Sequence, residues 1–250
     1  MTDITLVDNS KINGLMKLWL YQFYILAHLS WPFLAHDFDK SFANKLNSTI
    51  LRHLKRWAGI STSAETGVLF RSKDNFGLGL TSVVDHYLKM QLIKYDLFQN
   101  STDEAVKELM AIRVSREEKL TRVWKPTTLS KIINTEVDLD LKFPLQSSKI
   151  GLGHGNFNPN LSLSERRKMI TSKAMLFSEQ ERVAHSTSLS QQGVWLQWVD
   201  NALPFDFSWS NMIWGSNYHI VKFVLNASIN WVATPHLLKL WGLKENGCCT

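Results

Sequence analysis

The sequence contains almost no cysteine. Its 250 residues include only two, Cys248 and Cys249, which stand side by side near the C-terminal end. A disulfide between adjacent cysteines requires a strained ring, and no further ligands follow them at the spacing of a metal site. These observations exclude a disulfide framework and favour a reducing compartment.

The motifs of common catalytic centres are also missing. The one glycine-rich loop, GLGHG at residues 151–155, has neither the Lys-Ser/Thr of a phosphate loop nor the spacing of a dinucleotide fingerprint. The eight histidines are scattered, without an HExxH zinc motif, and no G-x-S-x-G nucleophile motif occurs. The acids Glu136, Asp138 and Asp140 alternate along the chain, so a helix would not place them on one face. The sequence therefore predicts neither a catalytic centre nor a bound cofactor.

Long uninterrupted apolar runs are absent. The one candidate for a membrane span, residues 18–35, has the right length but is interrupted by Gln22, His28, Ser30 and Pro32. No basic segment precedes it and no small-residue cleavage site follows it, so it lacks the pattern of a signal peptide. We interpret it as a buried helix, and we expect an intracellular protein, nuclear or cytoplasmic, without a membrane partner.

Aromatic residues and positive charge are abundant. Ten Trp and thirteen Phe predict an aromatic-rich core. Tryptophan pairs in the C-terminal part could stack on bases, but their helical spacing favours core positions: Trp195 and Trp198, Trp209 and Trp214, Trp231 and Trp241. The 28 Lys and Arg against 22 Asp and Glu give a net charge of +6, with seven basic and four acidic residues in residues 1–60. This excess suits an anionic partner.

Apolar residues recur at helical spacing through most of the chain. In residues 39–59 they form one stripe at steps of three and four: Phe42, Leu46, Ile50, Leu54 and Trp57. We expect Asp39 or Ser41 to cap this helix and Gly59 to end it. A similar stripe in residues 81–98 predicts a second helix. Between the two, residues 63–80 predict turns, with a short strand near residues 68–70.

The second half is predicted to be helical on both sides of a linker. Residues 101–125 predict short surface helices, residues 126–141 favour a helix over a strand, and residues 143–160, rich in Gly, Pro and Asn, predict the linker. Ser162 and Glu165 then form a capping-box pattern. Apolar pairs follow with a seven-residue period typical of helix packing: Met169/Ile170, Leu176/Phe177 and Val183/Ala184. Short helices complete the chain, so the predicted class is mainly α.

Two basic clusters are candidates for an anion site: Arg52, Lys55 and Arg56 at the end of the first helix, and Arg166, Arg167 and Lys168 at the start of the helix after the linker. Positive charge in a last turn stabilises the helix dipole without any ligand. Positive charge in a first turn opposes the dipole, which favours a partner, and phosphate is the natural one.

Five segments, taken in order, resemble one protein family: VDNSKINGLMKLWLYQFYILAHLSWPFLAHDF, ILRHLKRWAGIS, GLGLTSVVDHYLKM, QQGVWLQWVDNAL and KFVLNASINWVATPHLLKLWGL. They are similar to the part of a non-LTR retrotransposon reverse transcriptase that follows the polymerase palm. The resemblance covers nearly the whole chain, from Val7 to Cys249. It implies a thumb-like helical bundle in residues 1–100, surface helices and a linker in 101–160, and a second helical region in 161–250.

The resemblance also implies a function. In that family the palm holds its metal ions with aspartates in an F/Y-x-D-D turn, and this sequence has no such turn. We therefore expect a nucleic-acid-binding fragment without polymerase activity of its own, whose partner is RNA or DNA rather than a small molecule. The resemblance makes Arg52, Lys55 and Arg56 the first choice for phosphate contacts, and the basic cluster at residues 166–168 the second.

In relatives, WGL is followed by C-x2-C, then His and Cys, a small zinc knuckle. Cys249 stands in the place of the first ligand, and Cys248 cannot replace the second because adjacent cysteines do not reproduce the C-x2-C spacing. We expect no bound zinc and a truncated fragment. Two alternatives stay open. One is a helical protein-interaction module that docks a partner helix on residues 169–184, and the other is a degenerate element copy without function.

Overall fold

The computed structural model describes residues 2–75, 77–134, 162–189 and 208–229, together with 232, 238, 239 and 242. Every regular element in these residues is a helix, which confirms the predicted mainly α class. Several predictions lie outside the described residues: those for the linker at 143–160, for the acids Glu136, Asp138 and Asp140, for the tryptophans Trp195, Trp198, Trp231 and Trp241, and for Cys248 and Cys249.

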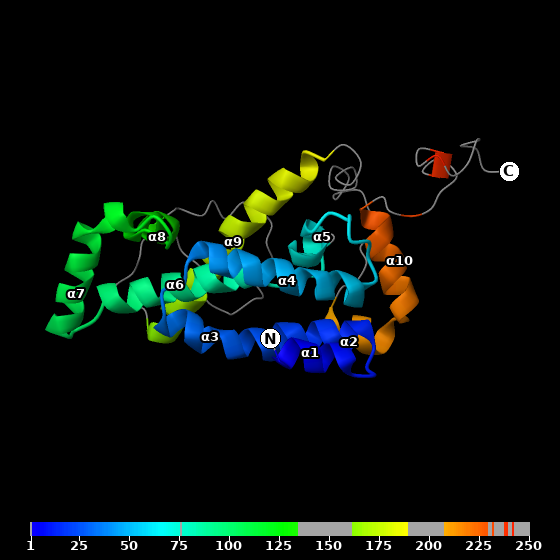
Figure 1. Cartoon of the computed structure of the whole chain (residues 1–250), viewed down its shortest axis with the longest axis horizontal. Helices are drawn as coiled ribbons and strands as arrows, with labels where there is room; N and C mark the ends of the chain where they lie inside the picture. Colours follow the sequence, from blue (N-terminus) through cyan, green and yellow to red (C-terminus); the bar gives the residue numbers. More distant parts are fainter. Residues whose placement is uncertain are drawn as a thin grey trace. The chain divides into compact units, whose positions relative to one another are not determined.

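Up to Asn134 the helices follow one another along the chain with mostly short connections (Figure 1). Those of the first hundred residues are α1 (Thr2–Asn9), α2 (Gly14–Leu20), η1 (Tyr21–Ile25), α3 (Leu26–Ala35), α4 (Lys40–Ala58), α5 (Gly67–Phe70), η2 (Lys73–Asn75) and α6 (Val83–Gln99). The later ones are α7 (Glu104–Ser115), η3 (Glu117–Lys119), α8 (Pro126–Asn134), α9 (Leu163–Thr187), η5 (Asn211–Gly215) and α10 (Tyr218–Ser228). The surface helices expected in residues 101–125 correspond to α7 and η3.

The chain divides into two compact units, each built from separate stretches of sequence. Unit 1 contains Met1–Gln22, Ile50–Leu80 and Arg182–Thr250, and unit 2 contains Phe23–Thr49 and Thr81–Glu181. These boundaries differ from the consecutive regions predicted to meet near residues 100 and 160. Two of them fall inside the long helices α4 and α9, where the sequence gives no signal of a change.

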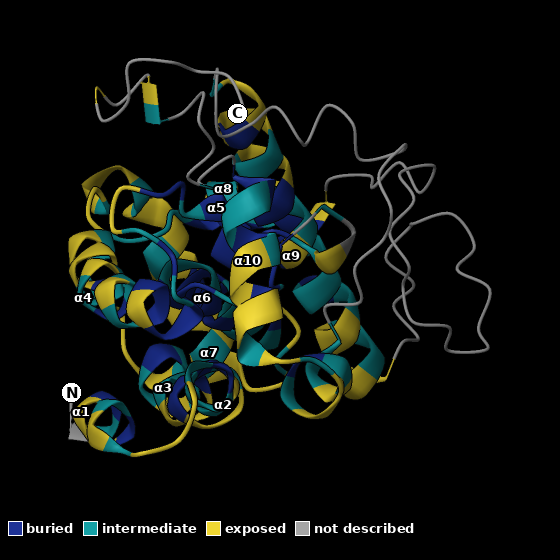
Figure 2. Cartoon of the chain, turned by 90° about the vertical axis from the view of Figure 1, so that its right-hand side faces the viewer, coloured by how far each residue is buried: buried dark blue, intermediate teal, exposed yellow. Residues whose placement is uncertain are grey.

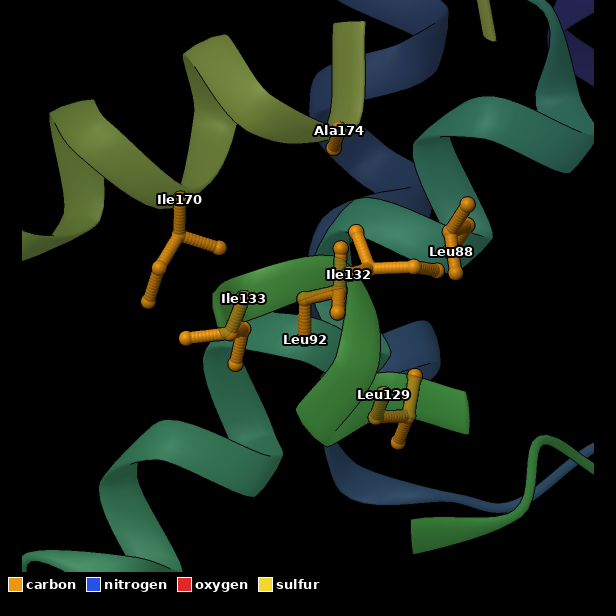
Figure 3. Packing of buried hydrophobic residues seen from close by; sticks show 7 residues of the cluster. All are labelled: Leu88, Leu92, Leu129, Ile132, Ile133, Ile170 and Ala174. Carbon is orange, nitrogen blue, oxygen red and sulfur yellow. The ribbon is translucent and has the colours of Figure 1, made fainter. Parts of the chain in front are cut away.

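Unit 2 is organised around α6. Ser82 caps this helix through a capping box, because its hydroxyl accepts the Asp85 backbone N–H while the Asp85 carboxylate accepts the Ser82 N–H. The cluster packed against α6 contains side chains from α8 and α9 (Figure 3): Leu88 and Leu92 with Leu129, Ile132, Ile133, Ile170 and Ala174. From the stripe predicted in residues 81–98, Leu88, Leu92 and Tyr95 face this core, whereas Tyr87 lies on the side that packs against α3.

A different side of α6 packs against α3 through polar contacts. The Gln91 side chain donates to the Phe33 carbonyl at 2.8 Å, and the Tyr87 hydroxyl donates to the Phe38 carbonyl at 2.5 Å. His86 is buried and lies 3.0 Å from the Ser30 hydroxyl. Gln91 and Tyr87 bind backbone carbonyls in or after α3, and His86 contacts a side chain of α3. Helix α6 is therefore buried on this side as well as on the side that faces the cluster (Figure 2).

Helix α9 begins as the sequence predicts. The Ser162 hydroxyl and backbone N–H both donate to Glu165, and the Glu165 N–H donates back to the hydroxyl, which confirms the capping box. The predicted seven-residue stripe is correct only in its first part, since Ile170 and Phe177 join the core but Ala184 is exposed. Buried positions instead recur every four residues, at Ile170, Ala174 and Ser178. This is the spacing of a helix that packs on a globular core and not on one partner helix.

Four further expectations need correction. Trp214, expected in the core together with Trp209, is 79% exposed. The segment around residues 68–70 is the helix α5 and not a strand, because the Glu65 carboxylate accepts the N–H groups of Gly67 and Val68 and closes a helical turn. Phe42 is exposed, and its neighbour Ala43 is buried in its place. Residues 18–35 are helical but only half buried, because Phe23, Tyr24 and Trp31 are exposed. None of the described helices is both long and apolar enough to cross a membrane.

We predict that unit 2 depends on the ion pair between Arg166 of α9 and Asp96 of α6. Their side chains are only 12% and 4% exposed. Replacing Arg166 with Ala leaves a buried carboxylate without its cation, so the free energy of unfolding should fall by about 3 kcal/mol or more. The neighbouring Arg167 is exposed, and Arg167→Ala should change it by less than about 0.5 kcal/mol. Urea unfolding followed by circular dichroism compares the two, and equal effects would contradict the prediction.

We also predict that acid destabilises unit 2 through His86. Burial, with help from the charge of Lys89, lowers the pKa of His86 from 6.5 to about 4. Between these pH values only the unfolded chain binds the proton, so the free energy of unfolding falls as the pH falls from 6.5 to 4, by on the order of 3 kcal/mol. Urea unfolding at several pH values measures this slope. The His86→Gln variant should lose that part of it, and an unchanged slope would count against the assignment.

Candidate nucleic-acid interface

The first basic cluster surrounds the C-terminal end of α4. This helix ends at Gly59, as predicted, in a left-handed conformation with φ of +69°. The Ile60 N–H donates to the Lys55 carbonyl at 3.0 Å, and the Gly59 N–H donates to the Arg56 carbonyl at 3.1 Å. This pair of bonds is a Schellman motif, which turns the chain back across the last turn of the helix. The three basic residues of the cluster consequently have different surroundings.

Lys55 faces inward. Its ammonium group donates to the carbonyls of Thr62 and Ala64, both at 2.6 Å, and the residue is buried. Burial lowers the pKa of Lys55, although the nearby charge of Glu65 acts in the opposite direction. Since two of its three donors hold the loop after α4, Lys55 has a structural role, and we leave it out of the candidate interface.

Arg56 lies on the surface but has a partner. Its guanidinium donates to the Asp8 carboxylate, which also accepts the Trp57 indole N–H at 2.8 Å and lies 3.4 Å from His53. Partial burial acts to raise the pKa of Asp8, but the hydrogen bonds from Trp57 and Arg56 outweigh it and hold that pKa below its usual value. The Arg56 side chain remains 62% exposed, so its other donors face solvent.

Arg52 lies one turn before Arg56 on the same side of α4 and is exposed. Within the described part of the chain it forms no hydrogen bond or ion pair with another side chain. Helix α4 as a whole contains five Lys and Arg and no Asp or Glu. The surface that carries Arg52 and Arg56 is therefore positive without local neutralisation, apart from Asp8.

The second basic cluster is divided in a similar way. Arg166 is paired with the buried Asp96, so its charge is used inside unit 2. Arg167 and Lys168 are exposed at the start of α9 and form no salt bridge among the described residues. The adjacent Glu165 carboxylate is bound to the cap residue Ser162, and those hydrogen bonds lower its pKa. Only two of the three predicted residues thus remain open to a ligand.

One further cation was missed by the sequence analysis. Lys222 is the only charged residue of α10, and its side chain runs across Gly59: a Cβ added to Gly59 would lie 2.7 Å from the Lys222 Cδ. The Tyr218 hydroxyl donates to the Trp57 carbonyl and the Asn226 side chain donates to the Gly59 carbonyl, both at 3.2 Å. Helix α10 is thereby fixed against the end of α4. No local pattern could reveal this, since Trp57 and Tyr218 are 161 residues apart in sequence.

We name the surface formed by Arg52, Arg56 and Lys222 the α4–α10 patch. It belongs to unit 1, where the excess of basic over acidic residues is larger than in unit 2 among the described residues. The described residues of this unit include ten basic ones: Lys11, Lys17, Arg52, Lys55, Arg56, Arg71, Lys73, Arg182, Lys222 and Lys239. They include four acidic ones: Asp3, Asp8, Glu65 and Asp74. Glu65 is buried in an ion pair with Arg71, and Asp8 is bound to Arg56.

Neither a metal centre nor a relative assists the assignment. Across the described ranges, no group of three or more His, Cys, Asp or Glu side chains is placed to hold a metal ion. No protein-family model matches the sequence, and the comparisons with curated proteins and with solved structures gave no match.

We predict that Gly59→Ala destabilises unit 1 more than Gly79→Ala. Both glycines have positive φ, +69° and +64°, so alanine is strained at either position by about 1 kcal/mol or more. At Gly79 the added Cβ meets nothing closer than 3.5 Å, whereas at Gly59 it meets Lys222 and the Tyr218 hydroxyl within 3 Å. Denaturant unfolding of both variants measures the difference. Equal losses would show that α10 does not lie where the structure places it.

Proposed function

We propose that the chain binds RNA or DNA through phosphate contacts at the α4–α10 patch, as a segment related to the post-palm region of non-LTR retrotransposon reverse transcriptases, and that it performs no polymerase chemistry by itself. One observation carries the proposal. Three exposed cations from two helices lie at or near one helix end, and the acid that contacts Arg56, Asp8, is also bound to Trp57.

The helix dipole alone does not account for this arrangement. Positive charge stabilises a helix only within its last turn, and that position is held by Lys55 and Arg56. Arg52 lies a turn earlier, and Lys222 lies in the middle of α10, outside the last turn of that helix. A surface that gathers cations from separate elements, with no acid on α4, is typical of a phosphate-binding protein.

The two arginines and the lysine would act in different ways. A guanidinium binds a phosphate with two parallel N–H donors, whereas an ammonium acts as a point charge. Asp8 restrains the Arg56 side chain, so binding there costs less conformational entropy than at a free side chain. Three contacts of this kind give affinity without base specificity, because phosphate contacts position a nucleic acid but do not identify its sequence.

The alternative of a helical interaction module receives less support. It assigned the stripe at residues 169–184 to a partner helix, but Ile170 and Ala174 are buried in the core of unit 2 itself. Leu176 is only partly exposed. The first half of the stripe is therefore part of the core of unit 2 and is not available to bind a partner helix.

We predict that binding is salt-dependent and localised to the patch. Each duplex phosphate contact lowers log K by about 0.9 per tenfold increase in salt concentration. The double variant Arg52→Glu with Lys222→Glu should therefore weaken binding roughly ten- to hundredfold at about 0.1 M salt. It should also make the slope of log K against log salt concentration less steep. Fluorescence anisotropy with labelled duplex DNA and RNA measures both quantities.

The control makes the same charge change elsewhere. Arg116 and Lys119 are exposed in unit 2, and Arg116→Glu with Lys119→Glu should weaken binding much less. Arg167→Glu with Lys168→Glu tests the second cluster separately. Salt-independent binding, or equal losses in all three double variants, would show that the patch has no particular part in binding.

A further inference from the structure

Helix α10 has three distinct sides. Val221, Leu225 and Ser228 are buried in unit 1. Tyr218, Lys222 and Asn226 recur every four residues and contact the end of α4. The remaining side is exposed (Figure 2) and carries His219, Ile220 and Phe223. It is therefore an aromatic and apolar surface that adjoins a cation.

Phe223 is the residue of this side that needs an explanation. It is 59% exposed, and Ile220, one turn before it, is 53% exposed. Single exposed apolar residues are ordinary, but here two large ones share a helix face. Phe223 directly follows Lys222, so its Cα lies about 1.5 Å further along the helix axis and its side chain points about 100° away from that of Lys222. The ring therefore lies on the side of α10 next to the side that carries the cation.

On the basis of the proposed function, we propose that Phe223 is a base-stacking residue, and that the α4–α10 patch takes single-stranded nucleic acid in preference to an uninterrupted duplex. In a duplex the faces of the bases are stacked against each other, so an aromatic ring beside the backbone has no free base face on which to stack. In a single strand the faces are free. A ring flanked by cations binds such a strand by stacking on a base while the cations hold the neighbouring phosphates.

The chemistry of the surface favours a nucleic acid strand over a protein or a lipid. Lys222 provides positive charge on the adjoining side of α10, Arg52 and Arg56 belong to the helix α4 whose end α10 contacts, and α10 has no acidic residue. The described acid at the patch, Asp8, is already bound to Arg56. A purely apolar protein partner would leave these cations without counter-charges, whereas a polyanion with free aromatic faces matches both features.

The experiment compares strands of equal length. Labelled 15-nucleotide single strands without self-complementarity, of DNA and of RNA, and the blunt DNA duplex are titrated by fluorescence anisotropy at fixed salt. The variants are Phe223→Ala, Phe223→Trp and Ile220→Ala. Phe223→Ala should weaken single-strand binding about five- to a hundredfold, leave duplex binding and the salt slope unchanged, and be rescued by Phe223→Trp. Ile220→Ala, which removes a comparably exposed side chain without a ring, should have little effect.

The contrary results are distinguishable. If the protein binds both forms equally well and Phe223→Ala changes neither, the stacking assignment is overturned while the phosphate proposal stands. If the wild-type protein binds neither form, the proposed function fails and this inference fails with it. If Phe223→Ala abolishes self-association but not nucleic-acid binding, the surface belongs to a second protein chain. Because Phe223 is largely exposed, Phe223→Ala should fold, and its thermal unfolding by circular dichroism verifies this.

Discussion

The arrangement of unit 1 depends on how the backbone carbonyls at the end of α4 are satisfied. The last four carbonyls of any helix lack partners within it. Here the Schellman bonds at Gly59 satisfy those of Lys55 and Arg56, and the Tyr218 hydroxyl satisfies that of Trp57. The reversed chain then brings its own carbonyls to the Lys55 ammonium. Both the burial of Lys55 and the position of α10 follow from this one helix end.

Basic residues that are adjacent in sequence have different surroundings in the structure. Lys55 and Arg56 are adjacent, yet one supports a loop and the other faces solvent, because successive residues of a helix point about 100° apart. In unit 2, Arg166 and Arg167 diverge in the same way, since only Arg166 reaches the carboxylate of Asp96. A basic cluster therefore provides fewer ligand contacts than its number of charges suggests. Each buried member is needed to neutralise or cap a group of the protein.

The sequence predicted what local physics determines. The helix end at Gly59 and the capping box of Ser162 with Glu165 follow from a few adjacent residues, and both are present. The helix α5 was missed because its first turn is closed by Glu65, a residue that no strand or helix pattern includes. In the same way, Arg52 and Arg56 could be identified as surface cations from the helical pattern. Lys222 could not, since its place beside Gly59 is set by contacts between distant segments.

Asp8 decides whether the patch is flexible or ordered before a ligand arrives. Its pKa is held below the usual carboxyl value, so it stays ionised at neutral pH and keeps Arg56 oriented. This stabilisation is present above the ordinary carboxyl pKa and is lost only as the pH falls through the lowered value. A phosphate bound by Arg56 must share the guanidinium with Asp8. This sharing reduces the affinity that Arg56 adds, but Asp8 still holds the guanidinium in a fixed orientation. Arg52 and Lys222 have no such acidic partner among the described residues. In the proposed complex they therefore attract the phosphates, whereas the oriented Arg56 positions the phosphate that it binds.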